Sequence, residues 1–142
     1  MIIPDLNLLV YAYNDGAPFH SETKKWWEDL MNGSQRVGIP WIISSGFVRL
    51  MTHPKVLAAP METSVVLDAV DEWFQSPHVS PVNPGSRHLD LFRQMIEAAG
   101  VGANLVTDAH IAAIASEYQA ELHSNDTDFG RFPGLNWKNP LT

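Results

Sequence analysis

The stretch that says most about the fold lies at the start of the chain and reads IIPDLNLLVYAY over residues 2–13. Residues 2–4 form a short apolar run, and Pro4 favours a buried strand at the edge of a sheet, since proline cannot donate a ladder hydrogen bond. Asp5 follows directly. Residues 6–13 are apolar on most faces, which favours a buried helix. The opening therefore predicts a strand, an acid at its carboxyl end, and a helix.

Helices and strands alternate along the rest of the chain. Helices are predicted over residues 20–31, 41–51, 63–74, from an N-cap at Ser86 to residue 99, and over 108–119 behind a cap at Thr107; strands over 37–39, 79–82, 121–124 and 135–137; and a loop over 125–133. This alternation is typical of an α/β domain with a mostly parallel sheet. With no internal repeat or linker in the sequence, residues 1–142 are expected to form a single domain.

Composition limits the chemistry that the chain can carry. The chain has 142 residues, of which 45% are apolar and 18% charged, as in a globular protein. It has no cysteine, which excludes thiolate metal sites and cysteine nucleophiles. A bound metal must therefore be held by oxygen or imidazole ligands. No signal peptide and no membrane-spanning stretch are evident, so a cytoplasmic protein without membrane contact is expected.

The formal net charge of −7 argues against attraction of nucleic acid to the protein as a whole. The acids are unevenly distributed, however, because none lies between Asp29 and Glu62, a stretch that contains Arg36, Arg49 and Lys55. Two interpretations of this gap remain open. It indicates either a locally basic face or a chance spacing of the acids.

Aspartates follow two of the predicted strands and begin one of the predicted helices. Asp5 follows one strand, Asp126 follows another with Asp128 beside it, and Asp108 begins a helix. Ligands of open α/β sheets bind at the carboxyl ends of the strands, so these carboxylates are expected to share a crevice. Clustered carboxylates repel unless a cation or a proton compensates them, and Mg²⁺ prefers such oxygen ligands. The residues therefore suggest metal-assisted phosphoryl chemistry, without separating a nuclease from a phosphatase.

Each acid also has a purely structural interpretation. Asp5 can cap the helix that follows it, and Asp108 can interact with the dipole of its own helix. Asp126 and Asp128 lie in a turn-rich segment, where aspartate is common for its local hydrogen bonds. Only their joint arrangement favours a metal site.

Three sequence blocks resemble the PIN-domain family of ribonucleases. Pro4–Ala12 is similar to the family's opening motif, Leu105–Ala115 to its helix with the third acid, and Ser124–Phe129 to its closing motif of Ser or Thr, any residue, Asp, any residue, Asp, Phe. Residues 41–56 and 137–141 further resemble VapC-type toxins. The resemblance implies a PIN-like three-layer α/β/α domain around a mostly parallel sheet.

The resemblance also implies roles for individual residues. Asp5, Asp108 and Asp126 would bind Mg²⁺ or Mn²⁺, and Asp128 would be a supporting or second-site carboxylate. Ser124 would hold the carboxylates by hydrogen bonding, and Asn7 would be a further supporting residue close to the metal. The implied protein is a homodimeric toxin of a type II toxin–antitoxin pair, which hydrolyses transfer or ribosomal RNA with a metal-activated water and is silenced by a VapB-type antitoxin.

One position departs from the family pattern. PIN domains usually carry a Glu in the helix after the second strand, and here that position is Gly46. An active endoribonuclease is favoured, because water can fill vacant Mg²⁺ positions. The alternative is a PIN-like protein that binds RNA or antitoxin without cleaving. A phosphatase ranks lower, because no phosphate-binding glycine loop is present. Arg49, three positions on, is a candidate RNA or antitoxin contact or a structural ion pair.

Among the aromatic residues, Trp27 and Trp73 are expected in the core or at a partner interface. If Trp73 were partly exposed, residues 65–74 would offer a groove for an antitoxin helix. Core packing is the favoured expectation.

Overall fold

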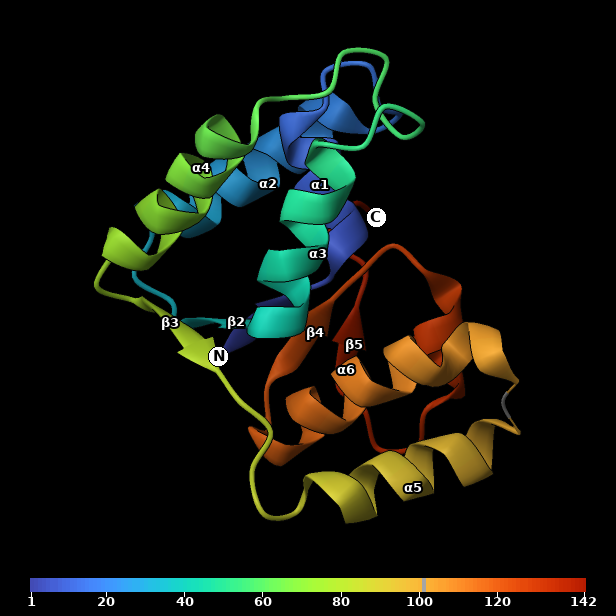
Figure 1. The fold of residues 1–142 in the computed structure, drawn as a ribbon. Helices are drawn as coiled ribbons and strands as arrows, with labels where there is room; N and C mark the ends of the chain where they lie inside the picture. The colour runs from blue at the N-terminus through green and yellow to red at the C-terminus, as the bar shows by residue number, and fades with distance from the viewer. Residues whose placement is uncertain (101) are drawn as a thin grey trace.

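A computed structural model describes residues 1–100 and 102–142 of the chain (Figure 1). The strands are β1 (Ile2–Pro4), β2 (Val37–Pro40), β3 (Val79–Val82), β4 (Glu121–His123) and β5 (Trp137–Lys138). The helices are α1 (Leu6–Tyr13), α2 (His20–Asn32), α3 (Trp41–Met51), α4 (Thr63–Gln75), α5 (His88–Ala99) and α6 (Val106–Glu117), with 3₁₀ turns η1 (Ala103–Leu105) and η2 (Thr127–Arg131). The predicted alternation of strands and helices is confirmed.

The sheet is parallel throughout, with strand order β3-β2-β1-β4-β5. The expectation that β1 lies at an edge is wrong, because β1 is the central strand. Its register with β4 runs from Ile2 to Pro4, and the backbone N–H of Asp5 donates to the carbonyl of His123 at 2.9 Å. Because Asp5 supplies that bond, the missing N–H of Pro4 does not interrupt pairing with β4.

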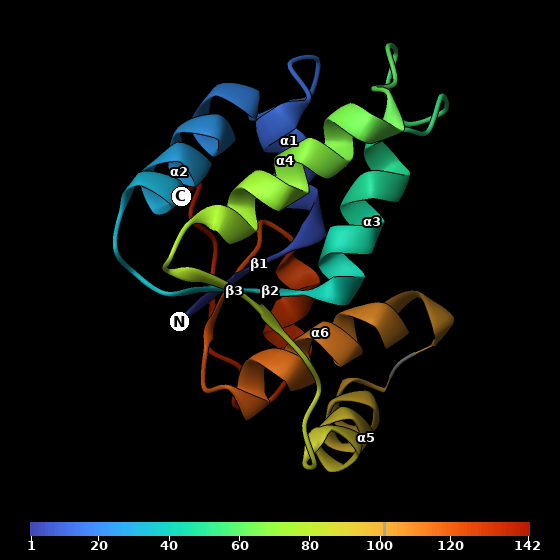
Figure 2. The ribbon, with the colours of Figure 1, turned by 60° about the vertical axis from the view of Figure 1, so that its left-hand side comes forward.

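The helices form two layers, one on each face of the sheet. Helices α1 to α4 lie on one side, and α5 and α6 lie on the other (Figures 1 and 2). Right-handed crossovers explain this arrangement, because the chain moves from β1 to β3 in one direction and then returns to β4 on the far side of β1. The direction of winding reverses between β1 and β4, and the carboxyl ends of these two strands are where such sheets bind ligands.

An aromatic cluster joins the four helices of the first layer. The ring of Trp73 lies 5.5 Å from Trp27 and 4.8 Å from Phe47, and its indole N–H donates to the hydroxyl of Tyr13 at 2.8 Å. Trp73 is only 2% exposed and Trp27 only 4%. The prediction that these tryptophans pack the core is confirmed, and a groove built on a partly exposed Trp73 is excluded.

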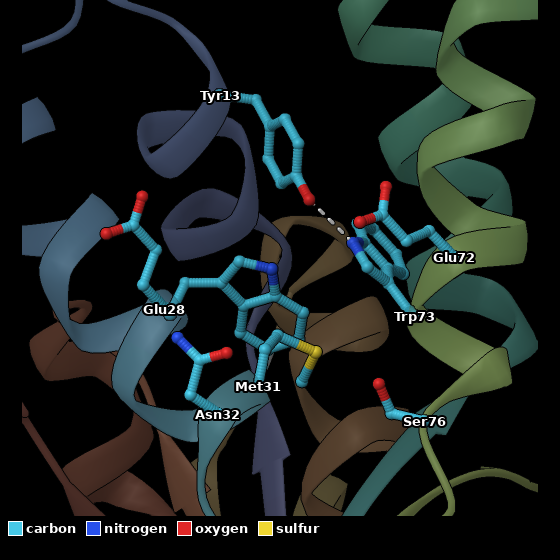
Figure 3. Close-up of a pocket in the computed structure, with 8 residues that line it drawn as sticks. Tyr13, Glu28, Met31, Asn32, Glu72, Trp73 and Ser76 are labelled. Carbon is cyan, nitrogen blue, oxygen red and sulfur yellow. Dashed lines mark hydrogen bonds between the residues drawn. The ribbon is translucent and has the colours of Figure 1, made fainter.

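A cavity of about 270 Å³ lies beside this cluster. Figure 3 shows Glu28 of α2 and Glu72 of α4 on opposite sides of it, with the Tyr13–Trp73 hydrogen bond above. None of the candidate carboxylates from the sequence lines this cavity. It is therefore separate from the strand ends described above.

Two helix starts differ from the prediction. Helix α5 begins at His88 with Arg87 as its N-cap, not at a Ser86 cap. The carboxylate of Glu117, from α6, accepts from the backbone N–H groups of Gly85 and Arg87 at 2.7 and 2.9 Å. The carboxylate that accepts from the backbone at the start of α5 thus comes from a residue distant in sequence, Glu117, and not from Ser86.

Helix α6 also starts earlier than predicted. The turn η1 runs directly into it, so that Leu105 is the N-cap and Thr107 lies inside the helix. The predicted loop over residues 125–133 contains η2, and the last strand is Trp137–Lys138 rather than 135–137. No described helix is long and apolar enough to cross a membrane.

Candidate metal centre

Four aspartates meet at the carboxyl ends of the neighbouring strands β1 and β4. Asp5 follows β1 directly, and Asp126 lies three residues beyond β4, at the N-cap of η2. Asp128 is in η2, and Asp108 is in the first turn of α6. Parallel pairing of β1 with β4, with Pro4 opposite His123, aligns the two strand ends that carry the site.

Asp5 is buried, with only 5% of its surface exposed. Its Oδ1 accepts from the backbone N–H of Leu6 at 2.8 Å, so it caps α1, and its Oδ2 accepts from the hydroxyl of Ser124 at 2.8 Å. The structural role and a metal role are therefore compatible, because each carboxylate oxygen keeps a further lone pair.

Ser124 holds the two halves of the site together. Its hydroxyl donates to Asp5 and accepts from the backbone N–H of Asp126 at 3.0 Å, and its carbonyl accepts from the indole N–H of Trp137 at 2.9 Å. The side chain of Ser124 is fully buried. One serine thus fixes the Asp5 carboxylate and the start of the turn that carries Asp126.

Three further carboxylates converge beside Asp5. One oxygen from each of Asp108, Asp126 and Asp128 lies within 4.8 Å of the other two. Asp126 is held in place because its Oδ1 accepts from the backbone N–H of Asp128 at 2.9 Å. The guanidinium of Arg131 lies 3.4 Å from Asp128, so one acid of the cluster already has a positive partner.

The electrostatics follow from this crowding. Burial, reinforced by the negative charges of Asp5, Asp126 and Asp128, raises the pKa of Asp108 to about 6. Burial also raises the pKa of Asp5, although its hydrogen bonds with Ser124 and Leu6 oppose the shift. In its fully ionised form the cluster is therefore destabilised by repulsion between the carboxylates, and a bound proton or cation would relieve that repulsion.

The donor set is that of a hard cation. Within the described residues the metal-competent cluster consists of carboxylates alone. The nearby His123 is occupied, because the indole N–H of Trp26 donates to its Nδ1 at 3.0 Å and its Nε2 lies 2.6 Å from Glu121. His110 pairs with His88 at 2.9 Å. Oxygen ligands without imidazole fit Mg²⁺ or Mn²⁺ better than Zn²⁺.

The remaining predicted residues lie around the cluster. Asn7 is exposed in the first turn of α1, and its side chain makes no hydrogen bond within residues 1–100 and 102–142. Gly46 is buried in α3, and a Cβ placed on it would stand 2.7 Å from Cδ2 of Leu6. Arg49 is exposed one turn further along the same helix. The structure thus brings together five predicted residues, Asp5, Asp108, Ser124, Asp126 and Asp128, and leaves Asn7 and Arg49 outside their contacts.

Two residues at this end of the sheet were missed from the sequence. Arg131 follows Asp128 by three positions, a spacing that could have signalled the ion pair. Trp137 donates to the carbonyl of Ser124 from β5, the strand that pairs with β4, and no local signal indicates that contact. Both contribute to holding the η2 turn.

Comparisons with known proteins agree with this arrangement. The sequence model of the family described as PIN domain matches residues 2–135. Ribonuclease VapC33 of Mycobacterium tuberculosis is 44% identical over 99% of both chains. Ribonuclease VapC37 of the same organism is 39% identical, over 99% of this chain and 97% of the relative.

Solved structures match at the level of the fold. VapBC2 from Rickettsia felis, bound to a DNA fragment from its promoter, superimposes with a TM-score of 0.69 at 19% identity over 98% of each chain. VapC20 of Mycobacterium tuberculosis, a sarcin-ricin loop cleaving toxin, gives a TM-score of 0.64 at 17% identity, over 92% of this chain and 93% of that one.

Proposed function

This chain belongs to the PIN-domain family, among its VapC-type ribonucleases, and on that basis we propose that its carboxylate cluster binds Mg²⁺ or Mn²⁺ to hydrolyse RNA phosphodiester bonds. The observation that carries the proposal is the convergence of Asp108, Asp126 and Asp128 within 4.8 Å. Asp5 is close enough to contribute to the raised pKa of Asp108. Four carboxylates so placed repel each other, and a divalent cation relieves that repulsion.

We assign the metal-binding role to Asp5, Asp108 and Asp126, with Asp128 as a supporting or second-site carboxylate. Ser124 orients Asp5, and the backbone N–H of Asp128 orients Asp126 through its Oδ1. When bound, the metal would supply a water of lowered pKa and a positive charge for the phosphodiester. The protein's own contribution is a preorganised set of oxygens, whose positions are fixed before the metal arrives.

The substitution at Gly46 motivates a second candidate function. A site with one carboxylate fewer than the family pattern could bind RNA or an antitoxin without cleaving it. We favour the nuclease, because Mg²⁺ usually retains several waters, which can occupy the vacant position.

The biological role that we propose is the toxin of a type II pair, silenced by a VapB-type antitoxin. Structures of VapBC complexes share the fold of this chain. We propose transfer or ribosomal RNA as the substrate and the cytoplasm as the place of action. VapC20, which shares the fold, is a sarcin-ricin loop cleaving toxin.

We further propose that the chain forms a homodimer. An open cavity of about 510 Å³ between α3 and α4 has mostly apolar walls. Trp41 and Leu67, at its edge, are 52% and 51% exposed. Large apolar side chains gathered on one face are typical of a protein–protein contact.

Purified protein, freed of any partner, should be incubated with cellular RNA in Mg²⁺, in Mn²⁺ and in EDTA. Asp126→Asn is the matched control, because the asparagine Oδ1 can still accept from the N–H of Asp128 while the charge is lost. Discrete cleavage that requires the metal and disappears in the variant is the expected result. RNA binding without cleavage in either metal, from folded protein, would instead support the binding-only candidate.

A further inference from the structure

A third cavity, of about 300 Å³, lies between α1, α3 and α6. Leu6 and Thr107 line it, and each is the chain neighbour of a cluster acid, Asp5 and Asp108 respectively. The volume is at the lower end of the range for small-ligand pockets, roughly 300–1,000 Å³. Two residues that line the cavity are thus adjacent in sequence to two of the proposed metal ligands.

The walls of this cavity are mainly apolar. Leu6, Ile43 and Ile111 supply aliphatic surface, and the hydroxyls of Ser45 and Thr107 also line it. Such a surface can pack against the flat face of a nucleobase and leaves hydroxyls for its polar edge.

Gly46 leaves space for the cavity on the side of α3. It has no side chain, and a Cβ there would stand 2.7 Å from Cδ2 of Leu6. Any larger residue would have to displace Leu6 or project into the cavity that both residues line. The glycine therefore permits the close approach of α1 and α3 that shapes this space.

Arg49 gives the cavity a positive rim. It lines the cavity from the last turn of α3 and makes no ion pair within residues 1–100 and 102–142. Arg131, by contrast, is engaged with Asp128. The acid-free stretch of sequence between Asp29 and Glu62 explains why α3 offers Arg49 no local partner. A guanidinium on the wall of a cavity, without an ion-pair partner among the described residues, suits a ligand that carries its own negative charge.

We propose that this cavity receives a nucleoside of the RNA next to the cleaved bond, and that Arg49 pairs with a phosphate of that nucleotide. The inference rests on the proposed ribonuclease function. An RNA chain carries a phosphate at every nucleotide, so a phosphate at the metal site places its neighbour within reach of the adjoining cavity. A guanidinium can bind that phosphate through two parallel hydrogen bonds.

The first test compares Arg49→Gln with Arg36→Gln on an RNA whose cut site has been mapped. Arg36 is the matched control, because it is an exposed arginine that precedes β2 at the amino end of the strand. Arg49→Gln should lower kcat/KM at least about ten- to hundredfold, mostly through KM, because that is the effect of losing even one of the two charge-assisted hydrogen bonds to phosphate. Arg36→Gln should not. Equal effects of the two variants would overturn the proposal.

The second test asks whether the cavity holds a base. Replacing the nucleotide on either side of the cut with an abasic one should impair cleavage strongly on one side only. Ser45→Leu, which fills the cavity from α3, should lower cleavage of the intact RNA but leave the abasic RNA unaffected. Among the described residues, the Ser45 hydroxyl donates only to the carbonyl of Ile42 in its own helix, at 3.3 Å. Equal tolerance of abasic nucleotides on both sides would refute the subsite.

A third measurement separates this proposal from the ribonuclease function itself. Binding of a labelled short RNA in EDTA, followed by fluorescence anisotropy, needs no catalysis. One outcome is that the wild-type protein cuts no RNA, while Arg49→Gln weakens RNA binding and Arg36→Gln does not. That outcome would contradict the proposed ribonuclease activity and still support the nucleoside subsite. If RNA binding is unchanged while affinity for an acidic protein partner falls, Arg49 belongs to a protein interface and the subsite is refuted.

Discussion

The hydroxyl of Ser124 lies 2.8 Å from Oδ2 of Asp5, across 119 residues of sequence. This bond joins the ends of β1 and β4 and stabilises the negative charge of a buried carboxylate. Ser124→Ala removes the donor and leaves Asp5 with one fewer partner. We expect a loss of about 1–3 kcal/mol in the free energy of unfolding, together with weaker Mg²⁺ binding. Urea denaturation and a Mg²⁺ titration measure the two effects. Ser45→Ala, at an exposed serine of α3, should change stability by less than about 0.5 kcal/mol; similar losses from both variants would contradict this account.

The stability of the metal-free protein should depend on Asp108. Its pKa is raised from 3.8 to about 6, so the folded state favours the protonated acid. The stabilising contribution of this group is therefore present below the unfolded-state pKa and is lost as the pH rises through about 6. In EDTA, Tm should fall over that window, and Asp108→Asn should flatten the fall. Mg²⁺ should raise Tm more at neutral pH than at about pH 4, which lies below the raised pKa of Asp108. An unchanged pH profile in the variant would exclude Asp108 as the source.

The contact between Gly46 and Leu6 can be measured by a double-mutant cycle. Gly46→Ala gains helix propensity of about 1 kcal/mol but places a methyl group against Leu6. Leu6→Ala makes room for that methyl group. The double variant should therefore be more stable than the sum of the two single changes predicts, by about 0.5–3 kcal/mol. Additive free energies of unfolding would mean that Leu6 does not restrict position 46.

The environment of His123 fixes its tautomer. Trp26 donates to Nδ1, so the proton lies on Nε2, which donates to Glu121. Burial, the largest effect, lowers the pKa of His123, although Glu121 opposes the shift. The stability contributed by the neutral ring is present above the unfolded-state pKa and is lost as the pH falls below it. Nitrogen-15 NMR should show the Nε2–H form at neutral pH. Trp26→Phe should raise the pKa of the ring, because Nδ1 is then free to take a second proton while Nε2 still donates to Glu121. A dominant Nδ1–H form in the wild-type protein would contradict the hydrogen-bond assignment.

Self-association should depend on the apolar face between α3 and α4. Leu67→Lys introduces a charge at an exposed position of that face and should shift the protein towards monomer. Light scattering coupled to size-exclusion chromatography measures the change. Val56→Lys, at a similarly exposed residue outside the face, is the control. A dimer that tolerates Leu67→Lys would place the interface elsewhere.

The sequence predicted those parts of the fold that depend on local patterns. The helix over residues 41–51 and the strand over 79–82 are found with the predicted bounds, and Gly100 ends α5 in a left-handed conformation, with φ 63°. Features that depend on distant residues were not predictable in the same way. The cap of α5 comes from Glu117, and β1 lies at the centre of the sheet because β4 returns beside it.

The site shows the same division. Strand ends and acids are visible in the sequence, so Asp5 and Asp126 could be expected at one edge of the sheet. The contact of Trp137 with Ser124 depends on the pairing of β4 with β5, which no local pattern reveals. Likewise, the cavity beside Gly46 exists because α1, α3 and α6 meet there. It depends on how these helices pack together, which no sequence motif indicates.

The central position of β1 has a consequence for biosynthesis. During synthesis, β1 acquires its β4 neighbour only when residues 121–123 have been made. Folding of this sheet therefore depends on contacts of long sequence separation, which form late and slowly. A nascent chain, or a fragment that ends before Ser124, has Asp5 but neither its hydroxyl partner nor Asp126. The complete set of acids thus assembles only after Asp128 has been made, so a nascent chain that stops before Ser124 should lack the carboxylate cluster.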